Sequence, residues 1–282
     1  MAQIINTNLM SLNAQRNLSA TQSALATSVQ RLSTGLRVNS AKDDAAGLAI
    51  AERMNTQVRG MNVAIRNAND AISLSQTAEG ALSKINDMGQ RMRELAVQSA
   101  NATNNDEDRK ALNQEYQALA EEIKRNIAGT SFNGTKLFAA GAALTFQVGA
   151  NNATTDQITI TTATMTGDTD LSNALGAMGA NAASAPGISS FTFATDALGK
   201  LDTMLAKINS KRAEFGAVQN RFQAVIENLQ VSAENQTAAR SRIMDADFAS
   251  ETASLTRSQV LQQAGTAMLS QANSLPNNVL SL

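Results

Sequence analysis

The chain contains neither cysteine nor histidine. These two absences exclude thiol and imidazole nucleophile systems and every Cys/His metal cage. Tryptophan is also absent, and aromatic residues make up only 3% of a chain that is 43% hydrophobic. Aliphatic and small side chains of this kind suit long helices packed side by side better than a bulky globular core. We therefore expect a mainly α protein that is not an enzyme and that uses no metal or other cofactor.

Charge of one sign is not in excess either, since 23 Lys and Arg residues face 24 Asp and Glu residues. A balanced chain lacks the basic surplus that binds nucleic acid or an anionic membrane. No apolar run reaches the length of a membrane span, and the first residues do not form a secretory leader. We expect neither nucleic acid nor membrane as a partner, and secretion without a cleaved signal peptide.

The two ends of the chain have almost no charge. Arg16 is the single charged side chain in residues 1 to 30, and none follows Arg257. A helical stripe at the N-terminal end is formed by Ala14, Leu18, Leu25, Val29, Leu32 and Leu36. A second stripe, which Pro276 ends or kinks, is formed by Val260, Leu261, Ala264, Ala267, Met268, Leu275 and Val279. Helices without a charged face need cover on all sides, which either a globular body or further copies of the chain could supply.

The interior of the chain carries the stronger helical patterns. Ser40 and Asp43 have the spacing of a capping box that starts a helix running to about residue 99. At 1.5 Å per residue this helix is roughly 75 to 80 Å long, too long for a compact domain. A shorter helix returns from about residue 106 to Gly129, and a last long helix begins at Thr195 or Asp196. The pattern predicts an elongated antiparallel helical rod or coiled coil, with the terminal helices pairing as an inner domain.

The stretch of about residues 139–194 differs, because it is rich in Ala, Gly, Thr and Asn. Residues 144–148 and 157–161 alternate as strands do, which predicts a small β-hairpin. Residues 163–194 contain scattered glycines and a proline, which is typical of irregular surface structure.

Long blocks of the sequence resemble bacterial flagellins. In the N-terminal half the similar blocks read AQIINTNLMSLNAQRNL, QRLSTGLRVNSAKDDAAGLAIAERM and QRMRELAVQSANATN. In the C-terminal half they read RAEFGAVQNRF, ARSRIMDADFASET and QVLQQAGTAMLSQAN, with LPNNVLSL near the end. The chain differs from many members of that family in having no room for a large outer-domain insertion.

The resemblance implies a structural subunit that polymerises into the extracellular flagellar filament used for motility, by coupled folding of its terminal helices. It implies an inner domain of residues 1–44 and 238–282, disordered in the monomer, and a rod domain of residues 45–237. The partners implied are other copies of the chain, an export chaperone at the C-terminal segment, filament cap and hook-junction proteins, and an animal Toll-like receptor. The secretion route implied is type III export. The alternative is a hook-filament junction component or another axial flagellar protein.

Three groups of residues are candidate sites under this interpretation. The polymerisation contacts that we predict are Leu18, Leu25, Leu32, Leu261, Met268 and Leu275. The resemblance places Toll-like receptor recognition at Arg91, Leu95 and Glu115, which the helix spacing could gather on one patch. Gly216 interrupts the last long helix, where it serves either close helix packing or a conformational hinge.

Overall fold

The computed structural model describes residues 7–138, 141, 143–162, 165, 171, 175 and 187–280, with the backbone alone for residues 275–280. The chain divides into two compact units, and the boundaries fall inside two long helices. Unit 1 comprises residues 1–58 and 234–282, and unit 2 comprises residues 59–233. Each unit is described by itself.

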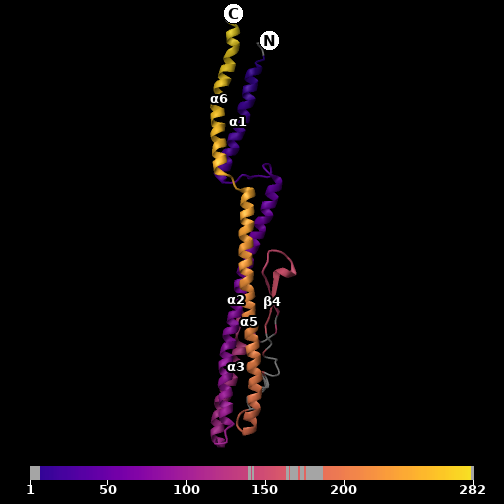
Figure 1. The fold of residues 1–282 in the computed structure, drawn as a ribbon, viewed down its shortest axis with the longest axis vertical. Helices are drawn as coiled ribbons and strands as arrows, with labels where there is room; N and C mark the ends of the chain where they lie inside the picture. The colour runs from indigo at the N-terminus through magenta and orange to yellow at the C-terminus, as the bar shows by residue number, and fades with distance from the viewer. Residues whose placement is uncertain are drawn as a thin grey trace. The chain divides into compact units, whose positions relative to one another are not determined.

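Unit 2 is built on three long helices that lie side by side (Figure 1). These are α2 (Ala45–Ser99), α3 (Asp106–Gly129) and α5 (Phe191–Met244), of which α2 and α5 continue into unit 1. Arg93 pairs with Asp202 and Glu79 with Arg212, so α2 and α5 run antiparallel. The mainly helical, antiparallel architecture that the sequence predicts is confirmed.

The core of unit 2 is formed by large side chains that are almost completely buried. The buried set from the three helices includes Leu82, Ile85, Met92, Tyr116, Ile123, Ile127, Met204, Ile208, Phe215 and Phe222. Small residues of α2 such as Ala68, Ala71 and Ala78 are also fully buried. They let the helices approach closely, which suits the low aromatic content of the sequence.

A β-hairpin packs on this helical core. Strands β3 (Ala143–Gln147) and β4 (Gln157–Thr161) pair antiparallel, as the alternating pattern predicts, and the 3-10 turn η1 (Thr154–Asp156) precedes β4. Phe146 meets Phe222 of α5 edge to face, with ring centroids 5.9 Å apart. Asn67 of α2 donates to the carbonyl of Gln147 at 3.0 Å. The hairpin is thus attached to both α2 and α5.

A second, smaller hairpin was not predicted. Strands β1 (Ser131–Phe132) and β2 (Thr135–Lys136) are joined by Asn133 and Gly134, whose φ angles are 47° and 79°. Two central residues with positive φ are what a tight type I′ hairpin turn requires, and Asn-Gly is its preferred sequence.

Helix boundaries follow local hydrogen bonds, and two of them correct the sequence interpretation. Ser40 and Asp43 do bond to each other, but they form a turn before α2, and Asp44 caps the helix by accepting from the Gly47 N–H at 2.8 Å. Helix α5 begins at Phe191 instead of near Thr195, because Ser190 accepts from the Phe193 N–H at 3.3 Å. Asn105 forms a complete capping box with Asp108 at the start of α3.

Unit 1 contains the terminal helices α1 (Leu9–Thr34) and α6 (Phe248–Leu280), which pack against each other. Helix α1 ends where Gly35 takes a left-handed φ of 71°. Helix α6 runs on to Leu280, so the chain does not leave the helix at residue 276, where the sequence predicts an end or a kink.

A short backbone connection joins the exit of α1 to the turn between α5 and α6. The Arg37 N–H donates to the Met244 carbonyl at 2.6 Å, and the Ala246 N–H donates to the Gly35 carbonyl at 2.9 Å. Val38, Ala51 and Met244 form a small buried cluster beside these bonds. This connection fixes where α1 and α6 meet.

Candidate functional site

Helices α1 and α6 meet along an antiparallel seam within unit 1 (Figure 1). At one end Asn8 donates to the Ala272 carbonyl, and Ser11 Oγ donates to Asn273 Oδ1, both at 2.7 Å. At the other end Arg31 pairs with Glu251 at 3.6 Å. The seam therefore extends over most of α1.

The seam itself is lined largely by small and polar side chains. On α1 the inward positions recur every three or four residues, at Ser11, Ala14, Leu18, Thr21, Leu25, Ser28 and Leu32. On α6 they are Ser258, Gln262, Gly265, Leu269 and Ala272. This spacing is that of a coiled coil, but serines, a glutamine and a glycine replace many of the large apolar side chains that normally fill such a seam. Leu18 comes close enough to Gly265 that a β-carbon there would lie 3.3 Å from its Cδ1 atom.

Large apolar side chains of the same two helices face outward instead. Met10 of α1 is 68% exposed, and Leu261 and Met268 of α6 are 52% and 68% exposed. Leu9, Leu12, Val29 and Val260 are exposed as well. Among the described residues, no contact buries these side chains, so this part of unit 1 presents exposed apolar surface.

A groove of about 400 Å³ runs between the two helices. Its lining includes Met10, Leu18, Leu261 and Met268, with small and amide side chains between them. The groove brings together residues from both ends of the sequence, which is the pairing that the sequence analysis predicts.

The predicted polymerisation residues fall into two sets. Leu18, Leu25 and Leu32 are half-buried in the α1–α6 seam, whereas Leu261 and Met268 point outward. The side chain of Leu275 lies outside the described residues. Met10 and Leu9, which are also exposed, were not among the predicted polymerisation residues. The lack of charged residues around them in the sequence could have indicated them.

The predicted recognition residues lie in unit 2. Arg91 of α2 donates through Nε to Glu115 of α3 at 2.9 Å and through a terminal nitrogen to Glu94 at 3.0 Å. The bond to Glu115, followed by that to Glu94, raises the pKa of the Arg91 guanidinium above its ordinary value. All three charged groups are well exposed.

Leu95 does not share this exposed patch. Its side chain is 1% exposed and belongs to the core of unit 2. The prediction that the helix spacing presents Leu95 beside Arg91 on one surface is therefore incorrect, since the Leu95 side chain is buried in the core.

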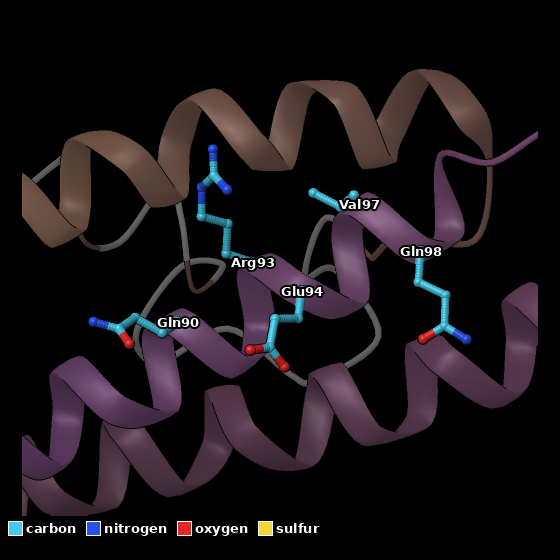
Figure 2. A pocket seen from close by; sticks show the side chains of 5 residues that line it. All are labelled: Gln90, Arg93, Glu94, Val97 and Gln98. Carbon is cyan, nitrogen blue, oxygen red and sulfur yellow. The ribbon is translucent and has the colours of Figure 1, made fainter.

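A shallow hollow adjoins the charged patch (Figure 2). It has a volume of about 510 Å³ and is lined by Gln90, Arg93, Glu94, Val97 and Gln98 of α2. Arg93 points toward the neighbouring helix (Figure 2), where its Nε donates to Asp202 at 2.6 Å. This bond is the main cause that lowers the pKa of the Asp202 carboxyl.

Within the described part of the chain, no cluster of acidic side chains is arranged to hold a metal ion. The described helices also include none with the length and hydropathy needed to cross a lipid bilayer.

Gly216 lies within the continuous helix α5. A β-carbon built there meets no atom within 4 Å. Close helix packing therefore does not account for this glycine.

Comparisons with known proteins match both ends of the chain to one family. Residues 5–143 match the model of the bacterial flagellin N-terminal helical region, and residues 198–282 match that of the C-terminal helical region. A flagellin from Halalkalibacterium halodurans is 44% identical over 99% of both chains. Flagellin D from Vibrio cholerae is 36% identical and is aligned over its whole length.

A solved structure shows the same fold at low sequence identity. It is a flagellar hook-associated protein from Vibrio parahaemolyticus, which is 13% identical, covers 72% of this chain and superposes with a TM-score of 0.61. The chain is more similar in sequence to flagellins, at 44% and 36% identity, than to that hook-associated protein, at 13%. The chain belongs to the bacterial flagellin family, the non-enzymatic structural subunits that self-polymerise into the extracellular flagellar filament used for motility.

Proposed function

We propose that α1 and α6 are the elements through which this flagellin polymerises, with their outward faces covered by the same helices of neighbouring subunits. In this proposal residues 1–44 and 238–282 form the inner layer of the filament, and residues 45–237 form the surrounding rod. One observation carries it: Met10, Leu261 and Met268 expose large apolar side chains on helices that have almost no charge.

The balance of free energies supports assembly by coupled folding. Fully burying one Leu or Met side chain contributes about 1.5–3 kcal/mol. Ordering each residue of a helix opposes this by about 1–2 kcal/mol of backbone entropy. Because the α1–α6 seam buries mainly serine, alanine and half-exposed leucine, the pair gains little alone and gains more when neighbours cover the outer faces.

Seeded growth of purified monomer on filament fragments tests the outward face. The double variant Leu261→Ser with Met268→Ser should fail to extend seeds, since it removes exposed apolar area beside the groove and leaves the buried seam positions of α6 unchanged. The matched control is Gln263→Ser with Gln271→Ser, two exposed neutral positions on the same helix. Growth of the leucine and methionine variant at the control's rate would refute the proposal.

Proteolysis tests the coupled folding. In the monomer, cleavage should concentrate within residues 1–44 and 238–282, and the same sites should become protected in the filament. Equal protection of both regions in monomer and filament would mean that the terminal helices fold without neighbours.

We further propose that the Arg91–Glu115 patch is the surface that an animal Toll-like receptor recognises. The two groups come from α2 and α3, lie 2.9 Å apart and are exposed, so a partner can reach both. Leu95 supports this surface indirectly, because its buried side chain packs α2 into the core.

The receptor test uses Arg91→Ala with Glu115→Ala and leaves Leu95 unchanged, because truncating a buried leucine destabilises the core by about 2–5 kcal/mol. Receptor signalling should fall strongly in the double variant. The control removes another exposed ion pair of α2, Lys84 and Asp87, whose charged atoms lie 3.8 Å apart. Signalling by the Arg91 and Glu115 variant equal to that of the control would exclude the patch.

The other partners that the family implies would use the same ends. We propose that an export chaperone covers the outward face of α6 before type III export, and that filament cap and hook-junction proteins contact the α1–α6 pair at the filament tips. Titration of the chaperone with the Leu261→Ser and Met268→Ser variant should show weaker binding than with the glutamine control. Equal binding would place the chaperone elsewhere.

A further inference from the structure

The methionines of the chain separate into two classes by exposure. Met61, Met92, Met165, Met204 and Met244 are buried, between 0% and 8% exposed. Met54 and Met88 are half-buried. Met10 and Met268 are both 68% exposed, and all other methionines of the described residues are buried or half-buried.

The two exposed methionines lie in one place. Met10 comes from α1 and Met268 from α6, and both line the groove between these helices, together with Leu18 and Leu261. The thioether of methionine is apolar and flexible, which lets it adapt to a partner surface. Since the chain has no cysteine, methionine holds all of its sulfur chemistry.

We propose that Met10 and Met268 are an oxidation-sensitive modification site, at which conversion of the thioethers to sulfoxides blocks incorporation of the subunit and reduction restores it. The inference rests on the proposed function, in which the outward faces of α1 and α6 contact neighbouring subunits. The co-reactant is a two-electron oxidant of the peroxide class.

The reaction balances with hydrogen peroxide as the oxidant. The sulfur lone pair attacks one peroxide oxygen, the O–O bond breaks and an S–O bond forms. The second oxygen leaves as hydroxide, takes up the proton of the new S–OH group and becomes water. Sulfur therefore loses two electrons, and the peroxide gains them. The product is a polar, chiral side chain at the centre of an apolar contact.

The consequence for assembly follows from burial. In the monomer a sulfoxide at either position is hydrated and leaves the core of unit 2 intact. In a covered groove beside Leu18 and Leu261 it would lose that water, and burial of an unpaired polar group is unfavourable. We expect the critical concentration for growth to rise about tenfold or more.

The experiment treats purified monomer with hydrogen peroxide, removes the peroxide with catalase, and measures seeded growth and the oxidation of each methionine by peptide mass spectrometry. Met10 and Met268 should oxidise first and the fully buried Met92 and Met204 last. Treatment of finished filaments should leave Met10 and Met268 protected. Oxidation of the buried methionines at the same rate, or unprotected Met10 and Met268 in filaments, would overturn the inference.

Variants assign the effect to the two side chains. Each variant is compared with its own untreated sample, so that any change in basal growth cancels. Met10→Leu with Met268→Leu should lose its peroxide sensitivity, whereas the control Met88→Leu should keep it. Methionine sulfoxide reductases A and B together, which reduce the two sulfoxide epimers, should restore growth of treated wild type. Unchanged peroxide sensitivity in the double variant, or no restoration by the reductases, would refute the site.

The two proposals fail in different ways. Normal growth of the untreated Leu261→Ser and Met268→Ser variant would remove the polymerisation surface, and this inference with it. Failure of that variant, combined with normal growth of wild type oxidised at both positions, would remove the oxidation site alone.

Discussion

Units 1 and 2 use the same kind of helix in opposite ways. In unit 2 the large side chains point inward, so that Phe222, Ile123 and Leu82 are fully buried. In unit 1 the buried positions of α1 are Ser11 and Ser28, while Met10 and Leu9 are exposed. Unit 2 thus buries its large apolar side chains in a core of its own, whereas α1 and α6 of unit 1 leave several of theirs exposed.

The first prediction compares a substitution in the core of unit 2 with one in the seam of unit 1. Phe222→Ala should lower the free energy of unfolding of the monomer by about 3–5 kcal/mol, because it empties a packed site and removes the edge-to-face contact with Phe146. Leu25→Ala in the half-buried seam of unit 1 should change monomer stability far less and impair seeded growth more. Urea unfolding and seed extension measure the two effects; equal stability losses would mean that unit 1 has an ordinary core.

The second prediction asks whether the hairpin belongs to the core of unit 2. A β-carbon at Gly60 would lie 2.9 Å from the Ala150 β-carbon and 3.2 Å from its Cα atom. Gly60→Val should therefore push the turn of the hairpin off α2 and lower stability by about 1–3 kcal/mol.

Gly80→Val is the matched control, since Gly80 lies on the same helix and a β-carbon there meets nothing within 4 Å. Thermal unfolding of both variants gives the comparison. A loss no greater at Gly60 than at Gly80 would show that the hairpin adds nothing to unit 2.

The third prediction concerns Gly216, which we propose to be a hinge of α5. Gly216→Ala should stabilise the helix by about 1 kcal/mol, because a methyl group fits there without contact. Gly199→Ala, at an equally open position of α5, should stabilise it similarly. If Gly216 is a hinge, Gly216→Ala should change the helical shape of filaments in the electron microscope, and Gly199→Ala should not. Unchanged filament shape in both variants would mean that Gly216 only lowers the stability of the helix.

The sequence predicted the parts of this fold that depend on local chemistry. The returning helix predicted from about residue 106 begins at Asp106, because Asn105 satisfies backbone groups within a few residues. The Asn133-Gly134 turn carried an equally local signal that was overlooked.

Long-range packing was less predictable, as Arg91 and Leu95 illustrate. Residues four apart on a helix differ by about 40° in direction. This difference is enough for Arg91 to be exposed while Leu95 is buried in the core. The predicted stripe of α1 did indicate the side that faces the partner helix, since Leu18, Leu25 and Leu32 lie in the seam. The predicted stripe of α6 did not, because Leu261 and Met268 are exposed. The inward positions of α6 include small residues such as Gly265 and Ala272, which do not form a pattern of large apolar side chains in the sequence.

The smallest expected effect is a pH dependence in unit 2. The hydrogen bond from Arg93 lowers the pKa of the Asp202 carboxyl below its ordinary value. A group with a lowered pKa stabilises the fold above the unfolded pKa and loses that contribution as pH falls through the folded one, so the pair should weaken only below about pH 4. Because both side chains are about half exposed, the loss should be small and should shrink further in high salt. Melting curves of Asp202→Asn and wild type should therefore converge at low pH and separate slightly at neutral pH; a separation that persists unchanged at pH 2 would mean that Asp202 acts through packing and not through its charge.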